Sequence, residues 1–149
     1  MSGIGVSVLL VALDQAVKFR IASSMRLGQS IPVLEGIFHI TYIENPGAAF
    51  GLFANQRWMF LGAGAALLLF AAVFYRRIRR SDCWTRYGAA LLLGGAVGNL
   101  IDRVRLGQVI DFLDFRIWPV FNIADIGICV GVGCILFALL REKSEEGSE

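Results

Sequence analysis

Apolar segments of membrane-spanning length take up most of this chain of 149 residues. The hydrocarbon core of a bilayer is about 30 Å thick, and a helix needs about 20 predominantly apolar residues to cross it. Such segments can be placed in four regions, residues 3–21, 58–75, 84–104 and 121–140. The composition agrees, because 56% of the residues are hydrophobic and 17% are charged, which is too apolar for an ordinary soluble domain. We therefore predict an all-α membrane protein with four transmembrane helices in a single domain, residues 1–149.

Arginine is concentrated between the second and third predicted spans. The stretch RRIRRSDCWTR, residues 76–86, contains five arginines. Short loops rich in arginine and lysine are typical of the cytoplasmic side of a membrane. This places both termini in the cytoplasm and the segment of residues 22–57 on the outer side.

The outer segment has the pattern of strands. Apolar and polar residues alternate from Ile37 to Ile43, and the sequence NPG, residues 45–47, then interrupts the pattern. An isolated hairpin is only marginally stable in water, but apolar contacts with the membrane surface and the helices could hold a small sheet. We predict a small extracytoplasmic β-rich segment.

Polar residues interrupt the apolar spans at matching depths. Asp14 and Lys18 lie one turn apart in the first span, and the third span ends in GGAVGNLIDR, residues 94–103. Gly95, Gly98, Asn99 and Asp102 of that motif share one helical face. Ionisable groups inside a membrane are costly and by default mark functional sites, although Asp14 and Lys18 could also form a purely structural ion pair. With the orientation above, these groups converge in the outer half of the membrane.

Three further acids lie before and at the start of the fourth span. Asp125 follows Asn122 by three residues in FNIAD, which is also the spacing of a capping box at a helix start. Asp111 and Asp114 both lie in VIDFLDF, a short extended stretch between the third and fourth spans, and physical reasoning from the residues does not choose between them. A short loop can bring one of these acids next to Asp125. Two close carboxylates share one proton and supply a general acid and a general base, as in aspartic proteases.

Other kinds of site have little support in the sequence. His39 is the sole histidine, and we expect it to be a surface strand residue. The serines are expected to lack a paired base, and no cluster of His, Cys and carboxylate has metal-ligand spacing. The net charge of +2 does not indicate nucleic-acid binding, because the basic residues cluster where membrane topology requires them.

Five motifs together resemble the lipoprotein signal peptidases, also called signal peptidase II. They are DQAVKF at residues 14–19, YIENPGAAFG at 42–51, GGAVGNLIDR at 94–103, VIDF at 109–112 and FNIAD at 121–125. Each motif is weak alone, but five in this order across four spans are specific. Pro46 departs from the family pattern, in which threonine is common at this position.

The resemblance implies a function and a set of site residues. Members of the family are aspartic intramembrane peptidases of the bacterial plasma (inner) membrane, and they cleave prolipoprotein signal peptides before a cysteine that carries a diacylglyceryl group. The catalytic pair maps onto Asp111 and Asp125, which selects Asp111 over Asp114. The supporting residues map onto Asp14, Asn45, Asn99, Arg103 and Asn122. The expected partners are lipid-modified prolipoproteins and membrane lipid, with no metal, no cofactor and no nucleic acid, and the protein is expected to be monomeric.

Two other classes of function remain compatible with the residues. A small transporter or proton pathway would also bury acids, arginine and asparagine inside a helical bundle, but it would be favoured by broken helices or a repeated half, and neither is evident. A structural membrane partner would need only the faces of small residues, such as the pair Gly94 and Gly98. The convergence of acids argues against that second class.

Overall fold

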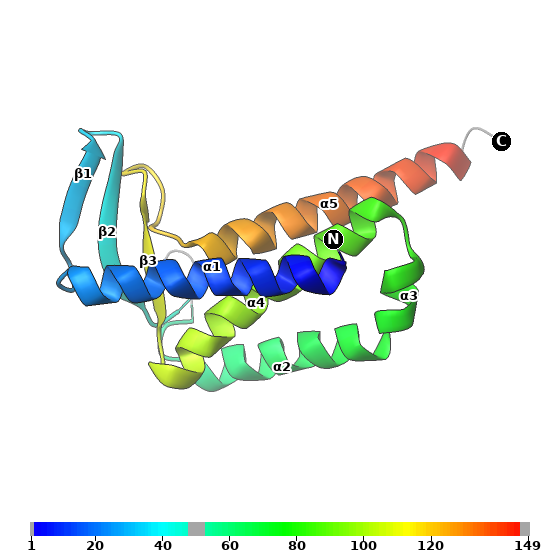
Figure 1. Cartoon of the computed structure of the whole chain (residues 1–149), viewed down its shortest axis with the longest axis horizontal. Coiled ribbons are helices and arrows are strands. Elements are labelled where there is room, and N and C mark those ends of the chain that lie inside the picture. Colours follow the sequence, from blue (N-terminus) through cyan, green and yellow to red (C-terminus); the bar gives the residue numbers. More distant parts are fainter. Residues whose placement is uncertain (1, 48–52, 147–149) are drawn as a thin grey trace.

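The computed structural model describes residues 2–47 and 53–146 and shows a bundle of helices with a small sheet at one end (Figure 1). Within these residues the chain forms four long helices at the positions of the predicted spans. They are α1 (Gly3–Ser24), α2 (Arg57–Val73), α4 (Cys83–Arg105) and α5 (Ile123–Glu146). The mostly helical architecture with a β-rich segment is therefore confirmed, with element ends shifted by a few residues.

Two stretches outside the predicted spans are helical. The arginine-rich stretch was expected to be a loop, but its first part forms a short helix, α3 (Tyr75–Arg80), directly after α2. The polar stretch after the fourth predicted span continues α5 as far as Glu146. Arginine, lysine and glutamate are good helix formers, so a helix can extend beyond its apolar segment without a compositional break.

The long helices pack around α4. It contacts α5 most extensively, then α1 and α2. Glycines allow this close approach: a Cβ atom at Gly95 would overlap the backbone carbonyl of Ala124 in α5, and one at Gly94 would lie 3.0 Å from the backbone oxygen of Ser7 in α1. The small-residue face predicted on the third span is thus a helix-packing surface.

The sheet contains a strand that the outer segment does not provide. Strands β1 (Ser30–Leu34) and β2 (Phe38–Asn45) form the expected hairpin, and β3 (Val109–Asp114) adds antiparallel to β2. The strand order is β1-β2-β3, and Asp111 pairs with Ile43. The extended conformation of β3 was predicted, but its partner was not.

The sheet rests on the end of α1 and on the start of α5. Tyr42, Ile110 and Phe112 form a buried cluster that packs against Val17 and Ile21 of α1. This contact fixes β3, and the acid in its middle, against the helical bundle.

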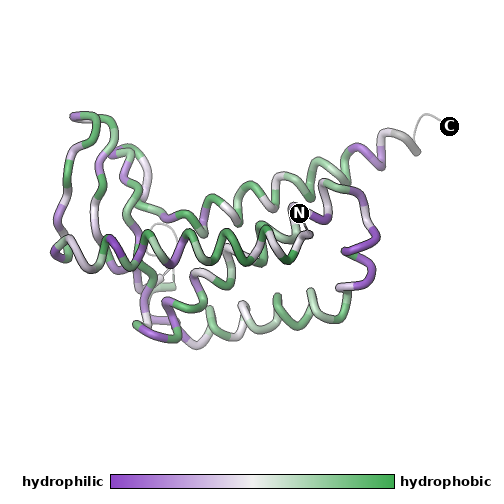
Figure 2. The backbone as a smooth tube through the Cα atoms, in the orientation of Figure 1, coloured by the Kyte–Doolittle hydropathy of each residue, from purple (hydrophilic) through white to green (hydrophobic). Residues whose placement is uncertain are grey.

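The outside of the bundle is apolar. Side chains such as Phe19, Trp58 and Leu69 are largely exposed, and Figure 2 shows hydrophobic residues along the helices with hydrophilic ones at α3 and near the sheet. By length and composition, one helix of the described chain, Ile123–Ser144, can cross a membrane, and Arg57–Val73 is similarly apolar but shorter.

Candidate active site

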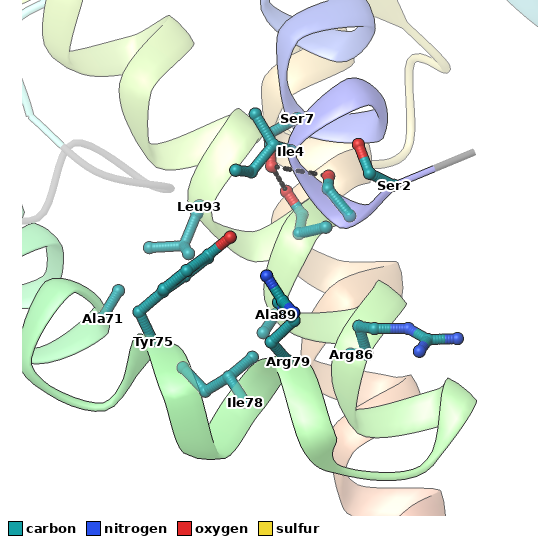
Figure 3. Close-up of a pocket in the computed structure, with 12 residues that line it drawn as sticks. Ser2, Ile4, Ser7, Ala71, Tyr75, Ile78, Arg79, Arg86, Ala89 and Leu93 are labelled. Atoms are coloured by element: carbon teal, nitrogen blue, oxygen red, sulfur yellow. Dashed lines mark hydrogen bonds between the residues drawn. The ribbon is translucent and has the colours of Figure 1, made fainter.

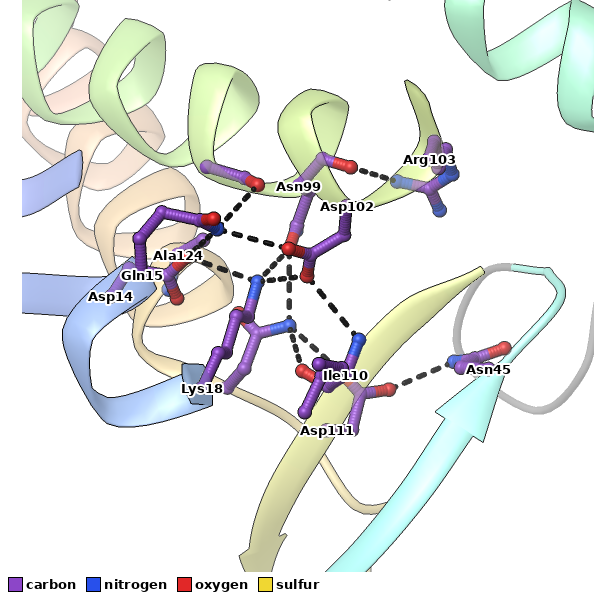
Figure 4. A network of polar contacts seen from close by, with 12 residues as sticks. Asp14, Gln15, Lys18, Asn45, Asn99, Asp102, Arg103, Ile110, Asp111 and Ala124 are labelled. Atoms are coloured by element: carbon purple, nitrogen blue, oxygen red, sulfur yellow. Dashed lines mark hydrogen bonds and ion pairs between the residues drawn. The ribbon is translucent and has the colours of Figure 1, made fainter. Parts of the chain in front are cut away.

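Asp111 lies in the middle of β3 with its carboxylate held on both oxygens. The side chain of Asn122 donates to its Oδ1 at 2.6 Å, and the side chain of Asn45 donates to its Oδ2 at 3.0 Å. The residue is 2% exposed. Figure 4 shows Asp111 beside the polar ends of α1 and α4, with Asn45 approaching from β2.

Asp125 lies in the first turn of α5 and is also held on both oxygens. The side chain of Asn99 in α4 donates to its Oδ1 at 2.7 Å, and the backbone N–H of Asn122 donates to its Oδ2 at 3.1 Å. In return, Asn122 Oδ1 accepts from the backbone N–H of Asp125 at 2.9 Å. These reciprocal bonds form the capping box that the spacing predicted.

Asn122 connects the two acids. Its side-chain amide donates to Asp111, while its side-chain oxygen and backbone N–H both bond to Asp125. The residue is completely buried, so its orientation is set by these bonds and by contacts to Asn99 and the backbone oxygen of Ile110. Asn122 therefore holds the carboxyl group of Asp111 with its side chain and that of Asp125 with its backbone N–H.

The environment of Asp111 favours its protonated form. Burial raises the pKa of this carboxyl to about 7, and the nearby negative charge of Asp125 adds to the increase. The hydrogen bonds from Asn45 and Asn122 act in the opposite direction but do not cancel it. Asp111 can therefore hold a proton near neutral pH, where an ordinary aspartate is ionised.

Asp114 has a different environment on the same strand. Its carboxylate accepts from the Thr41 hydroxyl at 2.7 Å, and it accepts from the backbone and the guanidinium of Arg116 at 2.8 and 3.0 Å. Burial alone would raise its pKa, but these bonds keep the pKa below the ordinary value. Asp114 is therefore an ionised structural group within the sheet.

A buried ion network lies next to the two acids. Lys18, which is 1% exposed, contacts Asp14 at 2.9 Å, Asp102 at 2.7 Å and the side-chain oxygen of Asn99 at 2.9 Å. The predicted contact between Asp14 and Lys18 is present. Asp102 from α4 completes the network, and its position on the same helical face as Asn99 was the sequence signal for this role.

Asp14 also connects the network to α5. Its Oδ1 accepts from the backbone N–H of Ala124 at 2.9 Å, at the positive end of the α5 dipole. Gln15 donates to Asp14 at 3.2 Å and to Asp102 at 2.9 Å. The charged groups thus hold α1, α4 and α5 together at the depth of Asp111 and Asp125.

Arg103 lies beside this centre. Its hydrogen bonds within the described residues go to the backbone oxygens of Gly47, at 2.9 Å, and Asn99, at 3.5 Å. Its guanidinium stacks over the ring of Phe60 at 4.3 Å. Arg103 therefore connects the end of α4 to the turn that follows β2.

That turn is built around Asn45. The side-chain oxygen of Asn45 accepts from the backbone N–H of Gly47 at 2.9 Å, while its amide group donates to Asp111. The supporting role predicted for Asn45 stays a prediction. Residues 48–51, the end of the motif YIENPGAAFG, lie outside the described residues.

One expectation about the serines was wrong. Ser30 lies 3.0 Å from His39 Nδ1 and 2.7 Å from the Thr41 hydroxyl, because β1 and β2 pair and bring these residues together. Asp114 bonds to Thr41 and not to His39, so the group lacks the carboxylate that orients a catalytic histidine. Within the described part of the chain no group of three or more His, Cys, Asp or Glu residues could hold a metal ion.

Comparison with known proteins identifies the family. The family model described as Signal peptidase (SPase) II matches residues 6–141. The chain belongs to the signal peptidase II family. It is 45% identical to the lipoprotein signal peptidase of Moorella thermoacetica over 143 residues, which cover 96% of this chain and 95% of that protein. It is 40% identical to the enzyme of Halothermothrix orenii, over 93% of this chain and 94% of that one.

Two solved structures of bacterial membrane enzymes also resemble this chain. A bacterial membrane enzyme matches with a TM-score of 0.88 and 34% identity, over 96% of this chain and 90% of that one. A second structure of a bacterial membrane enzyme matches with a TM-score of 0.81 and 34% identity, over 93% and 92%. The chain is thus a bacterial membrane protein and an aspartic peptidase of the signal peptidase II type, which cleaves lipoprotein signal peptides.

Proposed function

We propose that Asp111 and Asp125 are the catalytic pair of this signal peptidase. The observation that carries the proposal is the bonding of Asn122 to both carboxyl groups. This arrangement places two acids from different elements, β3 and α5, around one buried residue, Asn122. Close carboxylates divide one proton between them, and the raised pKa of Asp111 allows it to hold that proton near neutral pH.

The proposed mechanism uses the two acids in opposite protonation states. Ionised Asp125 takes a proton from a water molecule, whose oxygen attacks the scissile carbonyl carbon, while Asp111 donates its proton to the carbonyl oxygen. When the tetrahedral intermediate collapses, Asp111 recovers its proton and Asp125 gives its proton to the leaving amine. The pair returns to its starting state, and no group outside the chain is needed for the proton transfers.

The ion network supports four membrane crossings. Helices α1 and α4 contain charges that lower their mean hydropathy, but Asp14, Lys18 and Asp102 are buried against one another inside the bundle. Lipid would therefore meet only their apolar faces. Together with the exposed apolar side chains, this makes a four-span topology the best account of all the long helices of the described chain.

The proposed orientation puts the acids near the outer surface. The arginine-rich helix α3 lies at the opposite end of the bundle from the sheet, and short arginine-rich connections are typical of the cytoplasmic side (Figure 1). Both ends of the chain would then be cytoplasmic. The sheet would rest on the outer membrane surface, where water can reach the acids.

A lipid-modified substrate suits this location. A diacylglyceryl group keeps its attached cysteine at the interface, and each buried CH₂ contributes about 0.8 kcal/mol to membrane binding. The scissile bond before that cysteine would lie at the depth of Asp111 and Asp125. We infer that lipid contact dominates recognition and that the turn around Asn45 holds the substrate backbone.

The test is a cleavage assay with purified protein in micelles and without an ion gradient. Three synthetic peptides are compared: a lipidated signal peptide, the same peptide without lipid, and a lipidated peptide with an altered apolar run. Asp125→Asn is run beside Asp114→Asn, which changes a buried acid of the same sheet outside the proposed centre. We expect the lipidated peptides to be cleaved by the parent protein and by Asp114→Asn, and none to be cleaved by Asp125→Asn.

Two outcomes would overturn the proposal. Near-normal turnover by Asp125→Asn would remove this acid from catalysis. Equal cleavage of the lipidated and unlipidated peptides would replace the lipid-dependent peptidase with a general intramembrane aspartic peptidase.

A further inference from the structure

A cavity lies at the end of the bundle opposite the acids. It is formed by the start of α1, the end of α2, α3 and the first half of α4, and has a volume of about 130 Å³ (Figure 3). Its wall combines apolar side chains, including Ile4, Ala71 and Leu93, with Tyr75 and two arginines, Arg79 and Arg86. Nothing in the proposed peptidase mechanism uses these residues.

The positive charges of this cavity are not neutralised by acids. Neither Arg79 nor Arg86 contacts a carboxylate of the described residues, and the guanidinium of Arg86 lies 5.1 Å from the centroid of the Tyr87 ring. The nearby Asp82 is engaged with the backbone N–H groups of Trp84 and Thr85 at the start of α4. The N-terminus of α1, a helix of 22 residues, adds the positive end of its dipole beside Arg86. The cavity is therefore suited to an anion.

The apolar wall restricts what kind of anion fits. Helices α1 and α2 both pack on α4 but make few contacts with each other, so the cavity opens sideways between them. Ile4, which lines the cavity on the α1 side, is more than half exposed. A volume of about 130 Å³ is below the roughly 300–1,000 Å³ of pockets that enclose a whole small molecule, so the ligand must extend outside it.

We propose that this cavity binds an anionic glycerophospholipid from the membrane leaflet at this end of the bundle. Arg79 contacts the phosphate, Arg86 joins it by rotating its side chain away from Tyr87, Tyr75 offers its hydroxyl, and an acyl chain lies along Ile4 and Ala71 toward the bilayer. Basic pockets between membrane helices on the cytoplasmic side are a recurring site for such head groups. The proposal rests on membrane insertion and is independent of the roles given to the acids.

The test measures lipid binding by native mass spectrometry and by thermal unfolding. Delipidated protein in neutral detergent is titrated with phosphatidylglycerol or with uncharged phosphatidylcholine. The pocket variant is Arg79→Gln with Arg86→Gln, and the matched control is Arg76→Gln with Arg77→Gln, which removes the same charge from α3 outside the cavity wall. A third variant, Ala71→Phe, fills the apolar wall and keeps every arginine.

We expect phosphatidylglycerol to bind and to raise the unfolding temperature of the parent protein, with phosphatidylcholine much weaker. Loss of two arginines from the cavity should weaken binding about 30-fold, since each arginine near a membrane surface contributes about a factor of five. The control pair should weaken binding clearly less at physiological ionic strength, because its arginines lie outside the cavity wall and salt screens their attraction for the phosphate. Ala71→Phe should also weaken lipid binding, and it decides the question if the pocket variant does not fold.

Three results would overturn the proposal. Equal losses in the pocket and control variants would mean that only the general surface charge attracts lipid. Unchanged binding by Ala71→Phe would remove the acyl chain from the cavity. Competition by soluble glycerol phosphate at the same concentration as the lipid would show a simple phosphate site.

Discussion

Replacing Asp111 with asparagine should separate catalysis from stability. The amide keeps the size of the side chain and can accept the bond from Asn45 or from Asn122 with its one oxygen, but it cannot carry the proton that the reaction needs. Cleavage should be abolished while the protein remains folded and inserted. The variant should lose less stability than the parent protein as the pH rises, because it lacks the carboxyl whose pKa is raised.

The size of that change follows from linkage. The pKa of Asp111 is about 7 in the folded protein against an ordinary value of 3.8. A raised pKa means that the folded state holds the proton more tightly, so its contribution to stability is complete below about pH 4 and is lost as the pH rises through about 7. At about 1.4 kcal/mol per pKa unit, ionising this buried acid costs about 4 kcal/mol in total, of which about 3 kcal/mol falls between pH 5 and pH 8.

The measurement is the free energy of unfolding in detergent at pH 5 and pH 8 for the parent protein and for Asp111→Asn. The parent should lose about 3 kcal/mol more than the variant over this interval. Its cleavage rate should also fall above about pH 7, as Asp111 loses its proton. Identical pH dependence of stability in both proteins would refute the environment assigned to Asp111, and normal cleavage by the variant would refute its catalytic role.

The remaining predictions concern groups around the acids. Asn99→Ala should reduce cleavage more than Arg103→Ala, because Asn99 donates directly to Asp125 and Arg103 contacts backbone oxygens; equal activities in a kcat and KM comparison would refute this order. Lys18→Met should lower the free energy of unfolding by about 3–5 kcal/mol, since it leaves buried carboxylates unpaired, and an unchanged denaturant midpoint would contradict this. Gly98→Ala should destabilise by about 1–3 kcal/mol, because the added Cβ would lie 2.7 Å from an oxygen of Asp14; thermal unfolding measures this, with Gly62→Ala on open helix surface as control.

The elements that depend on local pattern could be predicted from the sequence. Apolar segments of about 20 residues located α1, α2, α4 and α5, because a helix of that length satisfies its own backbone within one segment. The bonds between Asn122 and Asp125 were also local, since a capping box joins residues three apart. The helical continuation at α3 was missed, because arginine density reports membrane topology and not backbone conformation.

The composition of the acidic centre was decided by the tertiary structure. The local sequence did not distinguish Asp111 from Asp114 as the catalytic candidate. They differ because, once β3 pairs with β2, Asp111 contacts Asn122 and Asp114 contacts Thr41. Lys18 was paired locally with Asp14, but its second carboxylate comes from Asp102 on another helix.

The polar contacts between α1 and α4 join residues more than eighty positions apart, so spacing along the chain carries no information about their distance in space. They form because glycines on α4 let three helices approach closely enough to exclude lipid, and buried charges must then find partners among themselves. The sequence by itself determined which polar residues enter the membrane domain. The packing of α1, α4 and α5 with β3 determined which of them hold the two acids together.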